Sequence, residues 1–216
     1  MTDQNIALVT GASRGLGAAC AEHLATRGWH IVAVARTTGG LEELDDRVKA
    51  GGKGSLTLAP MDVSDLAAMQ HLCLSVHQRW GGLQLWAHAA IHAAALAPAG
   101  SLDGKDWDKS IAINIRATGN LIPLVEPLLK QGHGTALFFD DPRAGEKFFG
   151  AYGASKAAQM ALVRSWAAET ARIGPRVVIA TPAGMPTATR ARFFPGEDRG
   201  KLTSTKAEAE RIIADL

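Results

Sequence analysis

Short apolar runs alternate with longer amphipathic stretches along almost the whole chain. The apolar runs predict buried strands at Ile6–Thr10, His30–Ala35, Ser55–Pro60, Leu83–Ala89, Thr135–Phe139 and Arg176–Thr181. The remaining stretches have apolar residues at helical spacing and predict helices at Gly15–Arg27, Leu41–Ala50, Leu66–Trp80, Trp107–Lys130, Tyr152–Ile173 and Lys206–Leu216. Strands that alternate with helices are typical of a parallel sheet covered by helices on both faces. The pattern therefore predicts one α/β domain over 1–216, with three layers and six parallel strands.

Glycine and proline residues refine these boundaries. Glycines follow the first three predicted helices, at Gly28, at 51–52 and at 81–82, where a helix end favours a residue that can adopt positive φ. Ser64 is expected to cap the third helix. Pro123 and Pro127 are expected to kink or shorten the fourth helix, because proline lacks the N–H that an interior position uses.

The segment Met185–Leu202 has a different composition from the rest of the chain. It carries two prolines and Gly196, and its middle, Arg190–Phe194, holds two arginines and two phenylalanines. Its length and composition are typical of a loop that covers a binding cleft, so we predict a substrate lid at 185–204. A partly disordered surface loop is the alternative interpretation.

Composition narrows the classes of function. The 216 residues carry a net charge of +2, which gives no electrostatic footprint for nucleic acid. A nucleic-acid role would be suggested only by Arg190–Phe194, with its two arginines and two phenylalanines. The start, Met1–Asn5, is polar and lacks the features of a signal peptide, and no apolar run is long enough to cross a bilayer. Cys20 and Cys73 lie in predicted helices and are expected to be buried, unpaired thiols. We therefore expect a cytoplasmic protein that binds neither nucleic acid nor membranes.

A glycine-rich turn, 11–17, joins the first strand to the first helix. Glycines allow close approach of backbone and phosphate, and the helix that follows presents free N–H groups to an anion. In this position the turn is typical of Rossmann-type dinucleotide sites, although a tight turn without a ligand would have the same pattern. The residues expected to contact the cofactor here are Gly11, Ser13, Arg14, Gly15, Leu16 and Gly17.

The end of the second strand indicates which cofactor binds. NAD-specific domains have an acid there for the ribose hydroxyls, whereas this chain has Ala35 and Arg36, with no acid before Glu42. Arg14 and Arg36 together would suit a 2′-phosphate. We therefore predict NADP(H), the alternative being that both arginines are solvated surface residues.

Four features together resemble the short-chain dehydrogenase/reductase (SDR) family. They are the turn 11–17, Asp62 after the third strand, Asn114, and the motif Tyr152–Lys156 (Tyr-Gly-Ala-Ser-Lys) at the start of the fifth helix. The resemblance extends from about Ile6 to Thr187. It implies catalytic roles for Tyr152 and Lys156, and for Asn114 as the residue that holds a water for proton relay.

The physical chemistry of Tyr152 and Lys156 agrees with that resemblance. Four residues apart, they project from one face of a helix, and an ammonium group near the phenol would lower its pKa and favour proton transfer. An ordinary buried tyrosine and an ordinary polar residue at Asn114 are the alternatives. The cofactor contacts that the resemblance adds are Asp62, Val63, Ala89, Tyr152, Lys156, Pro182 and Thr187; Asp62 could instead be a capping acid.

The sequence departs from the family pattern in three places. Where the family has a catalytic serine after the fifth strand, this chain has Asp140 and Asp141, and an ionised carboxylate would repel a developing oxyanion unless burial kept it protonated. The family's Asn-Asn-Ala-Gly is replaced by 88–91 (His-Ala-Ala-Ile), where His88 is interpreted as structural. Family members usually have a seventh strand after the last helix, and this sequence has none there. The sixth strand is therefore expected to be an exposed edge, or one subunit interface is expected to be lost.

Two functions remain open. The first is an NADP(H)-dependent oxidoreductase for a carbonyl or alcohol substrate, with Tyr152, Lys156, Asn114 and Asp141 as the catalytic set. The second is an NADP(H)-binding sensor or partner protein with weak or no catalysis. The resemblance implies a homodimer through the fourth and fifth long helices, and the alanines of the fifth would permit close approach of helices. The substrate pocket is expected to be lined by 91–97, 140–149 and the lid.

Overall fold

The six strands of the computed structural model, which describes residues 4–216, pair in parallel in the order β3-β2-β1-β4-β5-β6. The strands are β1 (Ile6–Thr10), β2 (His30–Ala35), β3 (Ser55–Pro60), β4 (Leu85–His88), β5 (Thr135–Phe139) and β6 (Arg176–Ala180). Residues 1–3, part of the polar segment before β1, lie outside the described residues. The predicted fold class, a Rossmann-type α/β domain with a six-stranded parallel sheet, is confirmed. The strand order reverses between β1 and β4, and ligands of such sheets bind in the crevice at that point.

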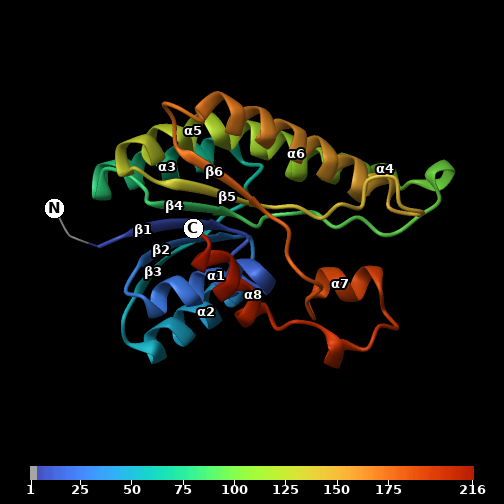
Figure 1. The fold of residues 1–216 in the computed structure, drawn as a ribbon, viewed down its shortest axis with the longest axis horizontal. Helices are drawn as coiled ribbons and strands as arrows, with labels where there is room; N and C mark the ends of the chain where they lie inside the picture. The colour runs from blue at the N-terminus through green and yellow to red at the C-terminus, as the bar shows by residue number, and fades with distance from the viewer. Residues whose placement is uncertain (1–3) are drawn as a thin grey trace.

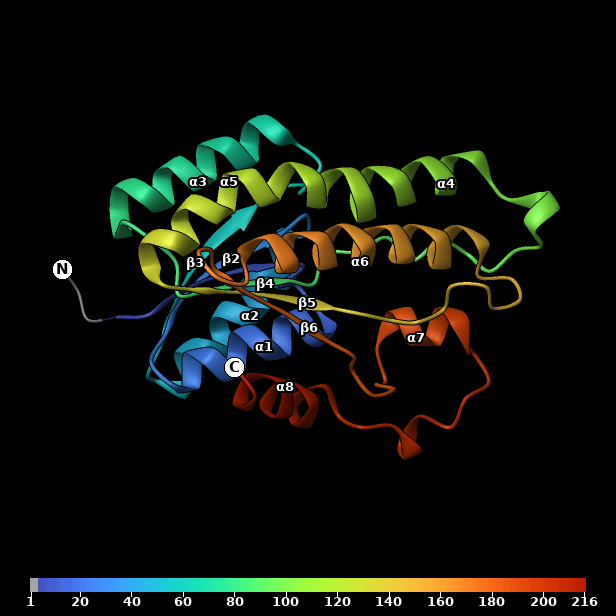
Figure 2. The same ribbon diagram turned by 45° about the horizontal axis from the view of Figure 1, so that its top comes forward.

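Helices cover both faces of the sheet. They are α1 (Gly15–Thr26), α2 (Thr38–Gly51), α3 (Leu66–Trp80), α4 (Gly104–Ser110), α5 (Ala117–Gly132), α6 (Gly150–Thr170), α7 (Ala188–Phe193) and α8 (Thr205–Ala214). Helices α3, α5 and α6 lie against one face, and α1, α2 and α8 lie against the other (Figures 1 and 2). None of the helices within 4–216 is long and apolar enough to cross a membrane.

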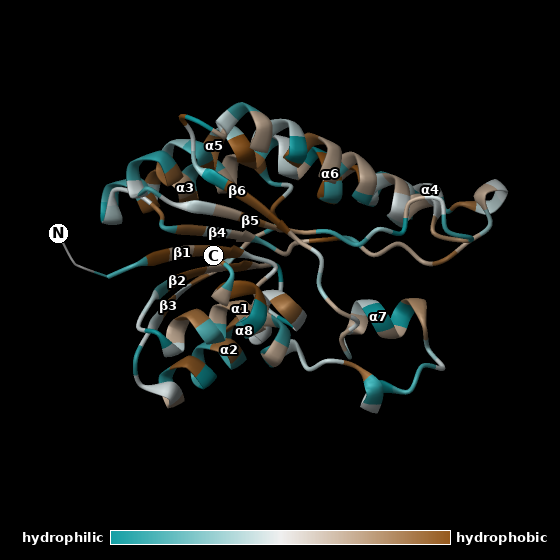
Figure 3. Cartoon of the chain, viewed as in Figure 1, coloured by the Kyte–Doolittle hydropathy of each residue, from teal (hydrophilic) through white to brown (hydrophobic). Residues whose placement is uncertain are grey.

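Both faces of the central strands are buried, which explains their continuous apolar runs. In β1, Ile6 and Leu8 enter the core beneath α3 and α5, and Ala7 and Val9 enter the core beneath α1. The strands are accordingly the most hydrophobic part of the chain, and the helices carry their polar residues outward (Figure 3). Cys20 and Cys73 are buried and unpaired, as predicted.

The fourth predicted helix is interrupted, but not at its prolines. One turn of π-helix, Ile111–Arg116, separates α4 from α5, and α5 continues past both prolines to Gly132. Pro123 and Pro127 are exposed, whereas Leu121, Val125 and Leu129 on the opposite side are fully buried. The carbonyl groups that lose a partner can therefore be hydrated while the buried stripe holds the helix in place. The prediction that the prolines shorten the helix was wrong.

Two smaller predictions are also corrected. Asp65, not Ser64, caps α3, and its carboxylate accepts from the N–H of Ala68 at 3.0 Å. The lid segment contains a helix, α7, and Phe193 of this helix is 6% exposed because it packs on Phe149 and Tyr152. The segment is therefore partly helical and packed, not a loop throughout, and its role as a lid stays a prediction. In Figure 1, α7 lies beyond the carboxyl ends of the strands.

Candidate active site

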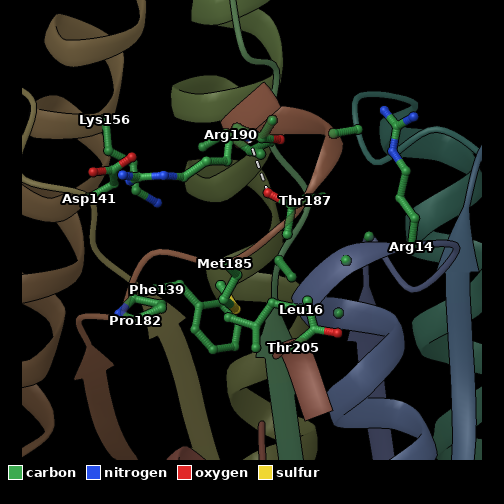
Figure 4. Close-up of a pocket in the computed structure, with 18 of the residues that line it drawn as sticks. Arg14, Leu16, Phe139, Asp141, Lys156, Pro182, Met185, Thr187, Arg190 and Thr205 are labelled. Atoms are coloured by element: carbon green, nitrogen blue, oxygen red, sulfur yellow. Dashed lines mark hydrogen bonds between the residues drawn. The ribbon is translucent and has the colours of Figure 1, made fainter. Parts of the chain in front are cut away.

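A cavity of about 700 Å³ opens at the carboxyl ends of the strands. Its walls come from the glycine-rich turn, the ends of β2 to β6, the start of α6 and the lid segment. Figure 4 shows Arg14 on one side of this cavity and Lys156 and Asp141 on the other, with Thr187 between them. Every predicted cofactor residue lines the cavity, and so do three of the four predicted catalytic residues, Asn114 being the exception.

The glycines of the turn are required by close backbone contacts. Gly11 has φ of +79°, and a Cβ there would lie 2.6–2.7 Å from the backbone of Ala89 and Ala90. A Cβ on Gly17 would collide with the carbonyl oxygen of Gly11. The turn is thereby pressed against the end of β4, so that α1, which starts at Gly15, points its amino end into the cavity.

Two arginine side chains lie at this end of the cavity. Within residues 4–216 the side chain of Arg14 has no hydrogen bond or ion pair. Arg36 has one loose contact, 3.8 Å from Asp62, and its side chain is 60% exposed. Asp62 itself does not cap α3; it accepts from the N–H and the hydroxyl of Ser64 at 2.9 and 2.7 Å. Two guanidinium groups are thus available to an anion here.

At the other end, Tyr152 and Asp141 form a hydrogen-bonded pair. The Tyr152 hydroxyl donates to Oδ2 of Asp141 at 3.0 Å, and Nε of Arg143 donates to Oδ1 at 3.0 Å. Both carboxylate oxygens of Asp141 therefore accept hydrogen bonds, and Arg143 supplies a positive charge.

The environment of Tyr152 differs from the expectation based on sequence. Burial raises the pKa of Tyr152 above its ordinary value, and the charge and hydrogen bond of Asp141 raise it further, with Arg143 acting in the opposite direction. The pKa of Tyr152 is thus raised, not lowered as its spacing from Lys156 predicted. The Lys156 ammonium donates to Oε1 of Gln159 at 2.7 Å. Burial lowers the pKa of Lys156 to about 8, against the charges of Asp140 and Asp141.

Asn114 lies outside the cavity and has a structural set of contacts. Its Oδ1 accepts from the N–H of His92 at 2.7 Å, and its Nδ2 donates to the His92 carbonyl and to Oγ of Ser155, both at 2.9 Å. The side chain is fully buried. Asn114 therefore fixes the loop after β4 against α6, and its role in holding a water stays a prediction.

His88 is enclosed at the end of β4. Nδ1 lies 2.7 Å from Oγ1 of Thr10, and Nε2 lies 3.2 Å from Oγ1 of Thr118. Burial, and secondarily the charge of Lys156, lowers the pKa of His88 to about 3. The ring is therefore neutral and its two hydrogen bonds join β4, β1 and α5.

This burial of His88 predicts a dependence of stability on pH. Below its ordinary pKa of 6.5, the unfolded chain binds a proton at His88 that the folded chain does not bind until about pH 3. The free energy of unfolding thus falls by about 1.4 kcal/mol per pH unit as the pH falls through this window. Above the window, His88 gives it no pH dependence. The measurement is the free energy of unfolding from urea titrations at pH 7 and pH 5. Between these two pH values it should fall by about 2 kcal/mol less in His88→Asn than in wild type. Parallel losses in the two proteins would contradict this assignment.

The lid contains site residues that sequence reasoning missed. The ring of Phe193 lies 4.8 Å from that of Tyr152 and 5.0 Å from that of Phe149. Arg190 lines the cavity beside Phe194. Its guanidinium group donates two hydrogen bonds to the Glu197 carboxylate, at 2.7 and 2.6 Å. No local sequence pattern predicts these contacts, because they depend on the tertiary packing of the lid.

The segment after β6 is held by the last helix. Glu208 of α8 is 2% exposed and its Oε1 accepts from the N–H of Ala183 at 2.9 Å, beside Pro182. Thr187 caps α7, accepting from the N–H of Arg190 at 3.2 Å, and a Cβ added at Gly15 would lie 3.6 Å from Cγ2 of Thr187. The start of the lid is thereby fixed next to the glycine-rich turn. Among the described residues, no group of His, Cys, Asp and Glu could hold a metal ion.

Comparisons with known proteins identify the family. The family model for short chain dehydrogenases matches residues 5–198. D-threitol dehydrogenase of Mycolicibacterium smegmatis is 33% identical over 183 residues, 83% of this chain and 70% of that protein. A Shigella flexneri protein assigned to the short chain dehydrogenases and solved in complex with NADP has a TM-score of 0.85 at 27% identity, covering 95% of this chain and 87% of that one. A 3-ketoacyl-ACP reductase from Sinorhizobium meliloti has a TM-score of 0.81 at 28% identity, covering 96% and 90%. The chain therefore belongs to the short-chain dehydrogenase family.

Proposed function

We propose that this protein is an NADP(H)-dependent oxidoreductase that interconverts a carbonyl group and an alcohol on a small molecule. The observation that carries the proposal is the pairing of two available guanidinium groups, Arg14 and Arg36, with Tyr152 and Lys156 across one cavity. An arginine without a partner at the amino end of a helix suits an anion such as a 2′-phosphate. The NADP complex of the Shigella flexneri relative supports the same cofactor.

The residues fit such a cofactor along the length of the cavity. The turn 11–17 would hold the pyrophosphate, Arg14 and Arg36 the 2′-phosphate, and Asp62 and Val63 the adenine. Ala89, Pro182 and Thr187 would enclose the nicotinamide end, and Lys156 would bind its ribose. When bound, the cofactor supplies or accepts a hydride.

Tyr152 would handle the proton of this reaction. In the reductive direction its hydroxyl turns from Asp141 to the substrate oxygen and donates its proton there. We propose that Lys156, which lines the same cavity, would favour the tyrosinate once the Tyr152 hydroxyl has turned away from Asp141. Phe193 and Phe149 pack around the ring and exclude water from it.

Asp141 restrains this chemistry. We propose that it occupies the place of the family's catalytic serine, so that the substrate oxygen would meet a carboxylate instead of a neutral donor. The hydrogen bond from Tyr152 to Asp141 also favours the alternative function, an NADP(H)-binding protein with little turnover. In that case NADPH would bind tightly and carbonyl compounds would not be reduced.

The direct test is NADPH oxidation with a panel of small ketones, aldehydes and quinones at saturating concentration. We expect at least one compound to be reduced faster by wild type than by Tyr152→Phe. Binding of NADPH with no such difference for any compound would favour the alternative, and absence of NADPH binding would contradict both.

We also propose a homodimer formed through α5 and α6. Small residues such as Ala161 and Ala168 on α6 would allow helices of two subunits to approach closely. Light scattering at micromolar concentration should give twice the chain mass of 22.7 kDa. The mass of a single chain would contradict the proposal.

A further inference from the structure

A chain of buried polar side chains leads from Lys156 into the centre of the domain. Nζ of Lys156 donates to Oε1 of Gln159 at 2.7 Å, and Nε2 of Gln159 donates to Oγ1 of Thr118 at 2.9 Å. From Thr118 the chain continues to His88 and then to Thr10 at the end of β1. The residues are at most 6% exposed, so the contacts are not shared with bulk solvent.

The direction of each hydrogen bond follows from the chemistry of the groups. An ammonium group can only donate, so the oxygen of the Gln159 amide faces Lys156 and its nitrogen faces Thr118. The Thr118 hydroxyl also donates to the carbonyl oxygen of Asn114 at 3.1 Å. Its oxygen therefore accepts from Gln159, and the orientation of the amide is fixed at both ends.

The same argument assigns the hydrogens at the other end of this series of side chains, on His88 and Thr10. Because the Thr118 hydrogen is used by Asn114, Nε2 of His88 must carry a hydrogen and donate to Thr118. Nδ1 then accepts from the hydroxyl of Thr10. The Gln159 amide, which lies between Lys156 and Thr118, is not a proton-relay group, so these side chains form a fixed frame and not a proton path.

We propose that Gln159 is a positioning residue for Lys156: its amide, anchored by Thr118, sets the direction of the ammonium group in the cavity. Among the described residues, Gln159 provides the one hydrogen-bond acceptor that Nζ of Lys156 contacts. Two N–H bonds of the ammonium remain for the cavity that Lys156 lines. The inference rests on the proposed function in one respect, the assignment of Lys156 to the reaction.

Burial explains why such an acceptor matters. Lys156 is 6% exposed, and a buried ammonium without a hydrogen-bond partner is strongly disfavoured. The titratable groups that face it are Asp140 and Asp141 after β5, His88 on β4, and Tyr152 on its own helix. The two aspartates act on Lys156 through charge without a hydrogen bond to Nζ, and His88 is neutral, so Gln159 alone orients the group.

Two substitutions at Gln159 should have opposite effects. Gln159→Leu removes the acceptor and should lower the pKa of Lys156 by about one unit, whereas Gln159→Glu places a carboxylate there and should raise it by a similar amount. The measurement is an NMR titration of the protein alone with lysine labelled at Cε, in which Lys156→Met identifies the signal. This readout does not depend on turnover.

A second pair of variants tests the anchor. Thr118→Val removes the acceptor that holds the Gln159 amide, and Thr118→Ser keeps the hydroxyl. Thr118→Val should shift the Lys156 titration in the same direction as Gln159→Leu, and Thr118→Ser should restore it. Gln78→Leu, at an exposed position of α3, is the control for a generic loss of glutamine.

The pH dependence of kcat should follow the titration. If the ammonium form is needed, activity falls above the pKa of Lys156, so this limb should move to lower pH in Gln159→Leu and to higher pH in Gln159→Glu. Unchanged titrations, or shifts of the same sign in both variants, would overturn the role of Gln159. Opposite titration shifts without any NADPH-dependent turnover would support the positioning role and count against the proposed enzyme.

Discussion

Replacing Asp141 by serine should raise kcat for carbonyl reduction by about 10²-fold, the size of effect that a single oxyanion donor has in other enzymes. The substitution removes a carboxylate that accepts a hydrogen bond from the Tyr152 hydroxyl, with 3.0 Å between the two oxygens. It introduces a neutral hydroxyl that can donate to the substrate oxygen. It also removes the charge and the hydrogen bond of Asp141, which are the largest causes of the raised Tyr152 pKa next to burial.

Asp141→Asn is the matched control for this change, because it removes the charge and keeps the size. Its rate should lie between those of wild type and Asp141→Ser. NADPH affinity should be unchanged in both variants. Arg143 keeps its second partner, Glu146, at 3.0 Å, so the wall of the cavity beside Asp141 should stay in place. A rate for Asp141→Ser equal to or below that of wild type, with NADPH affinity retained, would show that Asp141 does not restrain the reaction.

Replacing Tyr152 by phenylalanine should lower kcat by about 10²- to 10⁴-fold, the range typical of a lost general acid. The aromatic ring stays packed between Phe149 and Phe193, so the change removes the hydroxyl and little else. The loss is best measured in the Asp141→Ser background, where the starting rate is higher.

The binding of NADPH provides the control for Tyr152→Phe. The dissociation constant should change by no more than a few fold, because the phosphate contacts lie at the other end of the cavity (Figure 4). Activity within a few fold of the parent would mean that another group, such as Lys156, supplies the proton.

Strands proved easier to predict than helix boundaries, and α2 shows why. Its predicted start was Leu41, whereas the helix begins at Thr38 and includes Gly39 and Gly40. Glycine disfavours helix on propensity alone. However, a Cβ at Gly40 would lie 2.9 Å from Cβ of Ser13, so the glycine lets α2 approach the phosphate-binding turn. That requirement comes from packing and has no local signal.

The candidate site was predictable where one segment of the chain carries the chemistry. The turn 11–17 and the helix start at Tyr152 are local patterns, and the structure brings them to one cavity. Contacts between distant segments were not predictable. Gln159 meets Thr118 from 41 positions away, and the hydrogen bond of Tyr152 to Asp141 depends on the course of the loop after β5.

The side-chain contacts of Asn114 have the same origin. The π-helical turn at 111–116 directs its side chain to the backbone of His92, and its role in holding a water stays a prediction. A single extra residue in one turn changes which face a side chain occupies. Sequence periodicity reveals the helix and not this local change.

The central claim is that Arg14 and Arg36 bind the 2′-phosphate of the cofactor, and isothermal titration of the wild-type protein with NADPH and NADH tests it most directly. These two nucleotides differ only in that phosphate. Since charge-assisted hydrogen bonds contribute about 1.5–3 kcal/mol each, the dissociation constant of NADPH should be at least about 10-fold to 100-fold below that of NADH. Equal dissociation constants, or no heat with either nucleotide, would contradict the account.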